Sequence, residues 1–303
     1  MSRRKAGPRG SLMTQILRTT DNPQLTTDNW QTDMTYELGI LGAGNMAEAI
    51  ARGVIGAGIL GSPQIIASDV SAQRREVFGK QLGVRAVEDN REVAASSEVL
   101  LLSVKPQTMA KLMGEIGPVI RPETLVISIA AGISTRFIES HLGGGTPWRV
   151  IRTMPNTPML VGEGMAAISR GQHATAADAQ RARALFEAAA EVIDVPEEQL
   201  DAVTAVSGSG PAYFFYLVEK MIRAATELGI SPEHARKLSI KTALGAAKML
   251  STSQESPQEL RRRVTSPGGT TQAAITHLES HDVAGSIIGA IKAAEKRGKE
   301  LGS

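Results

Sequence analysis

The fold is decided by residues 36–47, whose sequence is YELGILGAGNMA. Its first half is apolar, Gly42 and Gly44 interrupt the run, and apolar residues then recur at helical spacing from Met46 to Ile55. This order predicts a strand, a tight turn and a helix. The first glycine suits the turn, and the second lets a pyrophosphate approach the backbone at the helix N-terminus. The flanking strand and helix favour a dinucleotide site over the alternative, a glycine-rich turn without a ligand.

Apolar runs and helical patterns keep alternating beyond this stretch. Strands are expected at residues 65–67, 99–103, 125–129, 149–153, 165–169 and 192–195. Helices are expected at residues 72–82, after Pro106 and at 176–190. This alternation predicts a parallel sheet built from βαβ units, and every segment after Pro196 has a helical pattern. We therefore expect an α/β domain over residues 35–195 and an all-α domain over 196–303.

The helices of the second domain carry more apolar surface than one chain can easily cover. In the helix after Pro211, an apolar stripe that begins at Phe214 is widened by neighbours such as Ile222. A stripe this wide needs packing partners on more than one side. The helix around residues 240–250 has almost no polar interruption. The pattern favours a homodimer, with a compact monomeric bundle as the alternative.

Composition excludes several classes of function. The chain has 303 residues, of which 42% are hydrophobic and 21% are charged, and this suits a globular protein with a buried core. Several of its 33 basic residues precede the first acidic residue, Asp21, so the remaining chain is slightly acidic. It lacks the broad basic face and the many aromatic rings that favour nucleic-acid binding. No apolar run approaches the roughly 18 residues of a membrane span, so we expect neither a nucleic-acid nor a membrane partner.

Residues 1–34 and the cysteine count bear on location. The sequence contains no cysteine, which excludes disulfides, thiolate metal sites and cysteine nucleophiles. Residues 1–34 are polar and aperiodic, and we expect a disordered or targeting-like extension there. The stretch has no acidic residue before Asp21 but also no apolar core, so a solvated tail is favoured over a targeting peptide. We expect a cytoplasmic protein.

Further candidate ligand loops follow the other expected strands. Ligands of open parallel sheets gather where the carboxyl ends of the strands meet. Pro106 begins the next helix, so Lys105 either points toward a cofactor or is solvated. The candidate cofactor residues in these loops are Ser68, Asp69, Asn90, Ser103, Val104, Lys105, Pro106, Ile129, Ala130 and Ala131.

A second glycine-containing loop, SPGGTT at residues 266–271, precedes the helical pattern at 272–278. Its bare amides, its hydroxyls and the positive end of the following helix suit a carboxylate, with an ordinary capped helix start as the alternative. His277 and His281 are four residues apart, but they stand at an expected helix end, so we expect no metal site. The chain shows no arrangement typical of a Ser or Cys nucleophile.

Several motifs follow one another in a characteristic order. They are Gly-Ala-Gly-Asn-Met at 42–46, Ser-Val-Lys-Pro at 103–106, Arg-Thr-Met-Pro-Asn-Thr-Pro at 152–158, Asp-Ala-Val-Thr at 201–204, Ser-Gly-Ser-Gly-Pro-Ala-Tyr at 207–213 and Ser-Pro-Gly-Gly-Thr-Thr at 266–271. In this order they resemble the motifs of pyrroline-5-carboxylate reductases. The resemblance covers residues 36–301, and the last two motifs are far more specific than the glycine fingerprint.

The resemblance implies a Rossmann-like N-terminal domain and a helical C-terminal domain that dimerises and binds substrate, with the active site where the two meet. It implies reduction of Δ1-pyrroline-5-carboxylate to L-proline, the last step of proline biosynthesis, with NADP(H) and/or NAD(H) as cofactor. The sequence leaves open whether homodimers associate further. The implied cofactor contacts are Gly42, Ala43, Gly44, Asn45, Met46 and the loop residues named above. The implied substrate contacts are Ala131, Ser266, Gly269, Thr270 and Thr271.

A protonated cyclic imine is already electrophilic, so hydride transfer mainly requires that the two rings are held close together and water is excluded. We therefore expect Thr271 to orient the substrate and Lys105 to affect the local electrostatics. One alternative is a two-domain reductase of hydroxy acids, but residues 207–219 lack the Lys or His base that it would need on an interdomain helix. The other is a non-catalytic nicotinamide-binding protein, for which loop 266–271 would have no evident purpose.

Asp69 bears on the choice between the two nicotinamide cofactors. It stands at the end of the second expected strand, where a carboxylate accepts hydrogen bonds from ribose hydroxyls and repels a 2′-phosphate. This favours NADH. In the opposite direction, Ser68 and Ser71 offer donors to a phosphate, and Arg74 or Arg75 could neutralise one, depending on the phase of the helix. We therefore expect both cofactors to be used.

Overall fold

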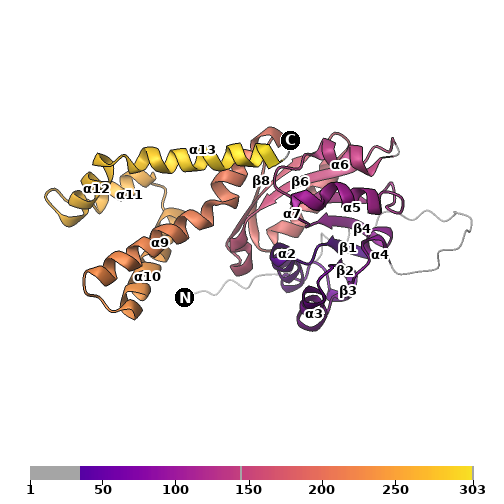
Figure 1. Cartoon of the computed structure of the whole chain (residues 1–303), viewed down its shortest axis with the longest axis horizontal. Helices are drawn as coiled ribbons and strands as arrows, with labels where there is room; N and C mark the ends of the chain where they lie inside the picture. Colours follow the sequence, from indigo (N-terminus) through magenta and orange to yellow (C-terminus); the bar gives the residue numbers. More distant parts are fainter. Residues whose placement is uncertain (1–34, 144, 302–303) are drawn as a thin grey trace, which may run out of the picture. The chain divides into compact units, whose positions relative to one another are not determined.

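The computed structural model describes residues 35–143 and 145–301, and the extension expected at residues 1–34 lies outside this range. The chain forms two compact units (Figure 1). The first runs to Thr204 and also contains the chain from Gly298 onward, while the second comprises Ala205–Arg297. The helical chain therefore leaves the first unit and returns to it.

The first unit is built on a sheet of eight strands in the order β3-β2-β1-β4-β5-β6-β7-β8. Neighbouring strands are parallel except β6 and β7, which are antiparallel, so the expected parallel sheet contains one antiparallel pair. The reason is the connection between them, which is too short for the dozen or more residues of a parallel crossover. The strands are β1 (Tyr36–Leu41), β2 (Ile65–Ser68), β3 (Arg85–Val87), β4 (Ser97–Leu102), β5 (Leu125–Ser128), β6 (Arg149–Pro155), β7 (Gly164–Arg170) and β8 (Ala190–Asp194).

Helices cover both faces of the sheet (Figure 1). Alternate strand residues enter opposite apolar clusters: Ile40 and Ile127 pack with α2 and α7, whereas Leu41 and Val126 pack with α4, α5 and α6. Strands buried on both faces are apolar almost throughout, and this made most of them visible in the sequence. The helices are α2 (Asn45–Gly56), α3 (Ala72–Glu76), α4 (Asn90–Ala95), α5 (Met109–Ile116), α6 (Thr135–Leu142), α7 (Ala176–Glu187) and the short α8 (Leu200–Val203).

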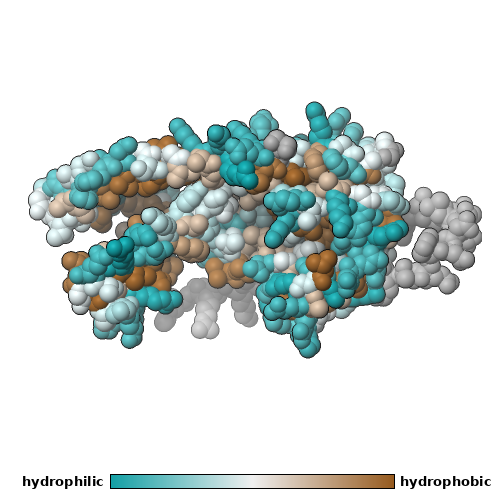
Figure 2. All heavy atoms as spheres, viewed as in Figure 1, coloured by the Kyte–Doolittle hydropathy of each residue, from teal (hydrophilic) through white to brown (hydrophobic). Residues whose placement is uncertain are grey.

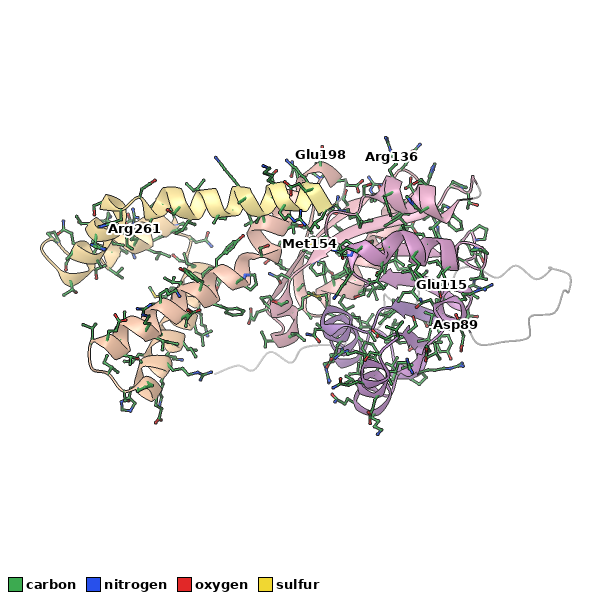
Figure 3. All side chains as sticks on the ribbon, viewed as in Figure 1. Asp89, Glu115, Arg136, Met154, Glu198 and Arg261 are labelled. Carbon is green, nitrogen blue, oxygen red and sulfur yellow. The ribbon has the colours of Figure 1, made fainter. Side chains whose placement is uncertain are left out.

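The second unit is entirely helical, which confirms the predicted all-α region. Its helices are α9 (Gly210–Glu227), α10 (Pro232–Thr252), α11 (Pro257–Arg263), α12 (Thr270–Ser280) and most of α13 (Val283–Leu301). Arg261 on α11 lies 3.9 Å from Glu279 on α12 (Figure 3). The turns before α10, α11 and α12 fall at the glycine- and proline-containing stretches that the sequence indicated.

The helical unit has almost no core within a single chain. Only Ala205, Gly210, Ala235 and Ser239 are buried between Ala205 and Arg297. Apolar side chains instead form much of its exposed surface (Figure 2). The large exposed side chains on α9, α10, α12 and α13 are Phe214, Phe215, Tyr216, Leu217, Leu238, Ile240, Leu244, Met249, Leu250, Leu278, Ile287 and Ile288. Such a surface requires a partner, because exposed apolar patches of this extent mark interfaces.

Among the described residues, no helix has the length and apolar character needed to cross a membrane.

Candidate functional site

The turn between β1 and α2 requires glycine at its first position. Gly42 has a φ of +94°, and a Cβ added there would lie 2.8 Å from the carbonyl oxygen of Ser103. Gly44 is the N-cap of α2, no side chain caps this helix, and no atom lies within 4 Å of where a Cβ on Gly44 would be. The first amides of α2 therefore have open space beside them, as a bound pyrophosphate needs.

Backbone hydrogen bonds hold the predicted cofactor loops together at one edge of the sheet. The amide of Gly42 donates to the carbonyl oxygen of Ser68 at 2.9 Å, and that of Ser103 donates to Leu41 at 2.8 Å. The amide of Ile129 donates to the carbonyl oxygen of Leu102 at 3.1 Å. The structure thus brings residues 42–46, 68–69, 103–106 and 129–131 to a common edge, as the rule for parallel strands predicts.

Asn90 is fixed at this edge by two side-chain partners. The hydroxyl of Ser68 donates to Asn90 Oδ1 at 2.7 Å. Asn90 Nδ2 in turn donates to both carboxylate oxygens of Glu115, at 3.2 and 3.3 Å, and Glu115 on α5 is labelled in Figure 3. Ser68 is fully buried. Its hydroxyl therefore orients Asn90, and Glu115 is a supporting residue that the sequence reasoning missed.

Lys105 is exposed at the start of a short 3-10 helix, Pro106–Thr108. Its backbone carbonyl accepts hydrogen bonds from the amide of Thr108 at 3.0 Å and from the hydroxyl of Thr108 at 2.9 Å. These hydrogen bonds fix the backbone of Lys105 but do not fix the direction of its ammonium group. The catalytic role of Lys105 stays a prediction, as does that of Thr271, which lies in the helical unit.

The loop before α12 has the backbone of an anion site. Gly268 has a φ of +71°, and its amide donates to the side-chain carbonyl of Gln272 at 2.5 Å. The amide of Gly269 donates to the carbonyl oxygen of Ser266 at 3.0 Å, so the loop is internally braced. Gly269 is the N-cap, and no side chain caps α12. The first amides of this helix, beginning with Thr270 and Thr271, are thus left for a ligand.

A hollow of about 540 Å³ lies along α12 and is lined by Gly268, Gly269, Gln272, Ala273, Thr276, His277 and Ser280. The rings of His277 and His281 face each other with centroids 4.3 Å apart, and His281 Nδ1 bonds the carbonyl oxygen of His277 at 2.8 Å. The imidazole of His281 thus forms a hydrogen bond within the helix end, and the ring of His277 packs against it. Within the described parts of the chain, no group of three or more metal-ligating side chains is present.

Arg152 forms a buried charge cluster that the sequence reasoning did not assign. It is 6% exposed, its Nη2 lies 2.8 Å from Asp201 Oδ1, and its Nη1 lies 3.6 Å from Glu197 Oε1. Glu197 also accepts hydrogen bonds from the amide and the hydroxyl of Thr135, each at 2.7 Å. The cluster fixes the segment after β8 on the sheet. An arginine in the middle of an expected strand was the available signal, because a buried cation needs an anionic partner.

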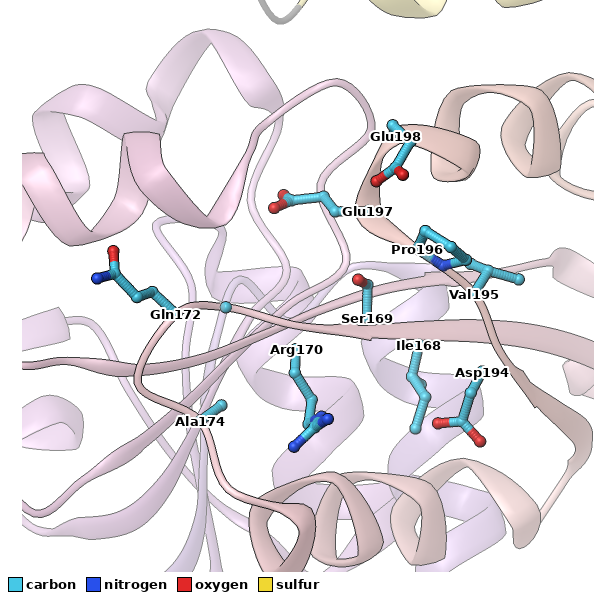
Figure 4. Close-up of a pocket in the computed structure, with 11 residues that line it drawn as sticks. Ile168, Ser169, Arg170, Gln172, Ala174, Asp194, Val195, Pro196, Glu197 and Glu198 are labelled. Carbon is cyan, nitrogen blue, oxygen red and sulfur yellow. The ribbon is translucent and has the colours of Figure 1, made fainter.

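A second hollow, of about 670 Å³, lies beside the ends of β7 and β8 (Figure 4). Polar side chains that line it include Ser169, Arg170, Gln172, Asp194, Glu197 and Glu198. Because β7 runs antiparallel to β6, this hollow lies at the opposite edge of the sheet from the cofactor loops.

Glu139 lies beside this second hollow and has an altered acidity. Burial raises the pKa of the Glu139 carboxyl. His173, the Gln172 backbone and Arg136 oppose this rise in pKa, and Glu197 adds to it. No predicted site residue lies there.

The sheet, the uncapped helix at the glycine turn and the cluster of loops define a nicotinamide-dinucleotide oxidoreductase. Residues 37–132 match the family model described as "NADP oxidoreductase coenzyme F420-dependent". Residues 197–301 match the model described as "Pyrroline-5-carboxylate reductase dimerisation".

Individual relatives agree with these matches. A pyrroline-5-carboxylate reductase of Pseudomonas aeruginosa is 42% identical over 268 residues, which cover 88% of this chain and 97% of the relative. The structure of a pyrroline-5-carboxylate reductase from Coxiella burnetii has a TM-score of 0.80 and 36% identity over 89% of this chain and 99% of that one. The Plasmodium falciparum pyrroline carboxylate reductase, solved with NADP bound, has a TM-score of 0.80 and 28% identity over 88% and 98%.

The chain belongs to the pyrroline-5-carboxylate reductase family. It is an NAD(P)H-dependent oxidoreductase with a Rossmann-like unit and a helical unit, as the resemblance implied. Neither alternative, a hydroxy-acid reductase or a non-catalytic nicotinamide-binding protein, is favoured by these matches.

Proposed function

We propose that this chain reduces the ring imine of Δ1-pyrroline-5-carboxylate to L-proline, with the cofactor on the first unit and the substrate carboxylate on the helical unit. The observation that supports this division is that α2 and α12 each begin at a glycine N-cap with no side chain over their first amides. Each start lies within a motif of the family. Two such anion sites match the two anionic groups of the reaction, a pyrophosphate and a carboxylate.

On the first unit, the proposed cofactor contacts are residues 42–46, Ser68, Asp69, Asn90, residues 103–106 and residues 129–131. The turn fits a dinucleotide, because a Cβ on Gly42 would collide with the Ser103 backbone that shapes the turn, and the space beside Gly44 is open to a phosphate. The bound nicotinamide supplies the hydride. The chain's own part is to fix the position of the rings and to exclude water, with Lys105 contributing positive charge.

On the helical unit, the proposed substrate contacts are Ser266, Gly269, Thr270 and Thr271, and on the first unit the proposed substrate contact is Ala131. Amides at a helix start and the Thr271 hydroxyl donate to a carboxylate, and charge-assisted bonds of this kind are short and directional. They fix the ring so that one face of the C=N carbon is presented. The hydride adds to that carbon of the protonated imine, and the π electrons of the C=N bond become the lone pair of the amine nitrogen, which already carries its proton.

The proposed assembly is a homodimer formed through the helical unit. Its support is the exposed apolar surface of α9, α10, α12 and α13, which the described residues of one chain leave uncovered. The match of residues 197–301 to a dimerisation model agrees with it. A dimer would give this unit the buried core that it lacks in one chain.

The proposed reaction is tested by following NADH and NADPH absorbance with the purified protein. We expect oxidation only when Δ1-pyrroline-5-carboxylate is present, with proline formed in an equal amount, because the carboxylate and the imine must both be held. Pyruvate and another 2-oxo acid serve as matched controls. Oxidation with a 2-oxo acid and none with the imine would place the protein among the hydroxy-acid reductases.

Thr271→Val tests the carboxylate site, because it removes one hydroxyl and nearly keeps the volume. A hydrogen bond to a charged group contributes about 1.5 to 3 kcal/mol, so KM for the imine is expected to rise at least about tenfold with little change in KM for the cofactor. Steady-state kinetics measure both constants. Thr252→Val is the control, because the Thr252 hydroxyl donates to the carbonyl of Lys248 at 2.9 Å within its own helix. An unchanged KM in Thr271→Val would place the carboxylate elsewhere.

A further inference from the structure

The carboxylate of Asp69 is held by two backbone amides. Its Oδ2 accepts a hydrogen bond from the amide of Ala43 at 2.8 Å, and its Oδ1 accepts one from the amide of Ser71 at 2.8 Å. The first bond joins the end of β2 to the glycine turn, and the second closes the turn into α3. A carboxylate with both oxygens bonded in this way is held in place. It therefore puts a carboxylate at the edge where the adenosine ribose of a dinucleotide lies.

Arg74 is drawn to the glycine turn by Glu48. Its Nε donates to the carbonyl oxygen of Ala43 at 2.5 Å, and its Nη2 lies 2.8 Å from Glu48 Oε2. The other oxygen of Glu48 accepts two hydrogen bonds from Arg52, at 2.9 and 2.7 Å. The side chains of Glu48 and Arg74 are 17% and 24% exposed, so this ion pair is partly shielded from solvent. The position of Arg74 also answers the question of helix phase that the sequence left open.

The pKa of the Glu48 carboxyl agrees with these ion pairs. Burial acts to raise the pKa of its carboxyl, but hydrogen bonds and charges of Arg74 and Arg52 outweigh burial and set the pKa below its ordinary value. Glu48 is therefore ionised at neutral pH and retains its cation.

Arg75 is occupied by the turn itself. Its Nη1 donates to the carbonyl oxygens of Asp69 and Val70, at 2.8 and 3.1 Å. Its Nη2 lies 3.1 Å from Glu88 Oε2. Both arginines that could balance a 2′-phosphate thus already have anionic and carbonyl partners. A phosphate beside Asp69 would meet like charge, and neither of these two arginines is free to offset it.

We propose that Glu48 is a specificity-determining residue: by holding Arg74 on the glycine turn it withholds that cation from the adenosine 2′ position, and together with Asp69 it makes NADH the preferred cofactor over NADPH. The inference rests on the proposed cofactor site at α2. Glu48 acts through Arg74 and is a positioning residue. Two carboxylates thus determine the preference between the cofactors. Asp69 at the end of β2 repels a 2′-phosphate directly, and Glu48 on α2 acts through Arg74.

The test compares the ratio of kcat/KM for NADPH to that for NADH across a set of variants. The unmodified protein is expected to prefer NADH. Glu48→Gln keeps the shape of the side chain and weakens its hold on Arg74, so the ratio is expected to rise about fivefold toward NADPH. Asp69→Ser removes the like charge and is expected to raise the ratio about tenfold. A generally damaged site would lower both rates and leave the ratio unchanged.

Two further variants decide whether Arg74 mediates the effect. Glu48→Gln combined with Arg74→Gln is expected to lose the gain of Glu48→Gln, because no cation is left to release. Arg52→Gln is the matched control: it removes the other arginine of Glu48 and leaves Arg74 in place, so the ratio is expected to stay that of the unmodified protein. A ratio unchanged in Glu48→Gln, or a gain that persists without Arg74, would overturn the proposal.

Binding without turnover separates this inference from the proposed reaction. Quenching of protein fluorescence by NADH and by NADPH, with no imine present, gives a Kd for each cofactor. We expect the same order of preference and the same shifts among the variants. If the binding ratios shift as expected and no imine is reduced, the proposed reaction fails and the specificity inference stands. Tighter binding of NADPH by the unmodified protein would overturn the inference even if the imine is reduced.

Discussion

Gly42→Ala is expected to lower kcat/KM for the cofactor at least about thirtyfold. A left-handed backbone costs an alanine roughly 1 to 2 kcal/mol, and overpacking adds about 1 to 3 kcal/mol. The new Cβ would lie 2.8 Å from the carbonyl oxygen of Ser103, which is backbone and cannot turn away as a side chain could. The turn must therefore open, which moves the first amides of α2 away from the phosphates. Cofactor titration by fluorescence measures the loss directly.

Gly58→Ala is the matched control for this prediction. Gly58 also has a positive φ, +68°, but no atom lies within 4 Å of where its Cβ would be, and it follows the other end of α2. We expect it to cost about 1 kcal/mol of stability and to keep cofactor affinity, because it shares the strain without the collision. If Gly42→Ala binds the cofactor as well as Gly58→Ala does, the turn is not where the dinucleotide binds.

Phe214→Glu is expected to raise the dissociation constant of the homodimer at least about a thousandfold. Phe214 on α9 is 62% exposed in one chain. Burying a phenylalanine contributes about 1.5 to 3 kcal/mol, and burying an unpaired carboxylate costs more. A symmetric interface contains the change twice. Light scattering across a range of micromolar concentrations should show twice the mass of the 32.0 kDa chain for the unmodified protein and a monomer for the variant.

Arg223→Ala serves as the control for Phe214→Glu. Arg223 lies nine residues further along α9, on roughly the opposite side of the helix, and pairs with Glu227 at 2.8 Å. We expect the mass of the dimer to be kept. Circular dichroism should show a loss of helix in Phe214→Glu alone, because the helical unit has no core of its own. A monomeric unmodified protein with full helix content would contradict the proposed assembly.

The sequence predicted those parts of the fold that rest on local apolar patterns. β1, β2, β4 and β5 are buried on both faces, so most of their residues are apolar, and the cofactor loops follow from their ends. The sequence did not predict β3, because this strand has only three residues and they are partly exposed. The helix expected at 72–82 is interrupted, since Val77–Gln81 form a π-helical stretch that contains Gly79, a weak helix former.

The contacts between distant residues could not be predicted from a single sequence. Arg152 and Asp201 are 49 positions apart, and Ala43 and Asp69 are 26 positions apart. No periodicity records such pairings, because they depend on how strands are ordered in the sheet. The same holds for Glu48 and Arg74. In the sequence both are ordinary charged residues of helical segments, and only the ion pair at 2.8 Å connects Glu48 with cofactor preference.

The return of the chain to the first unit at Gly298 makes the helical unit an insertion within the nucleotide-binding fold. A Cβ on Gly298 would lie 3.7 Å from the Cβ of Asp201, so the last turn of α13 packs on the segment through which the chain leaves. The last turn of α13 therefore belongs to the nucleotide-binding unit and supports its Asp201 segment. A truncation within that turn would leave the Asp201 segment, which also binds Arg152, without this contact.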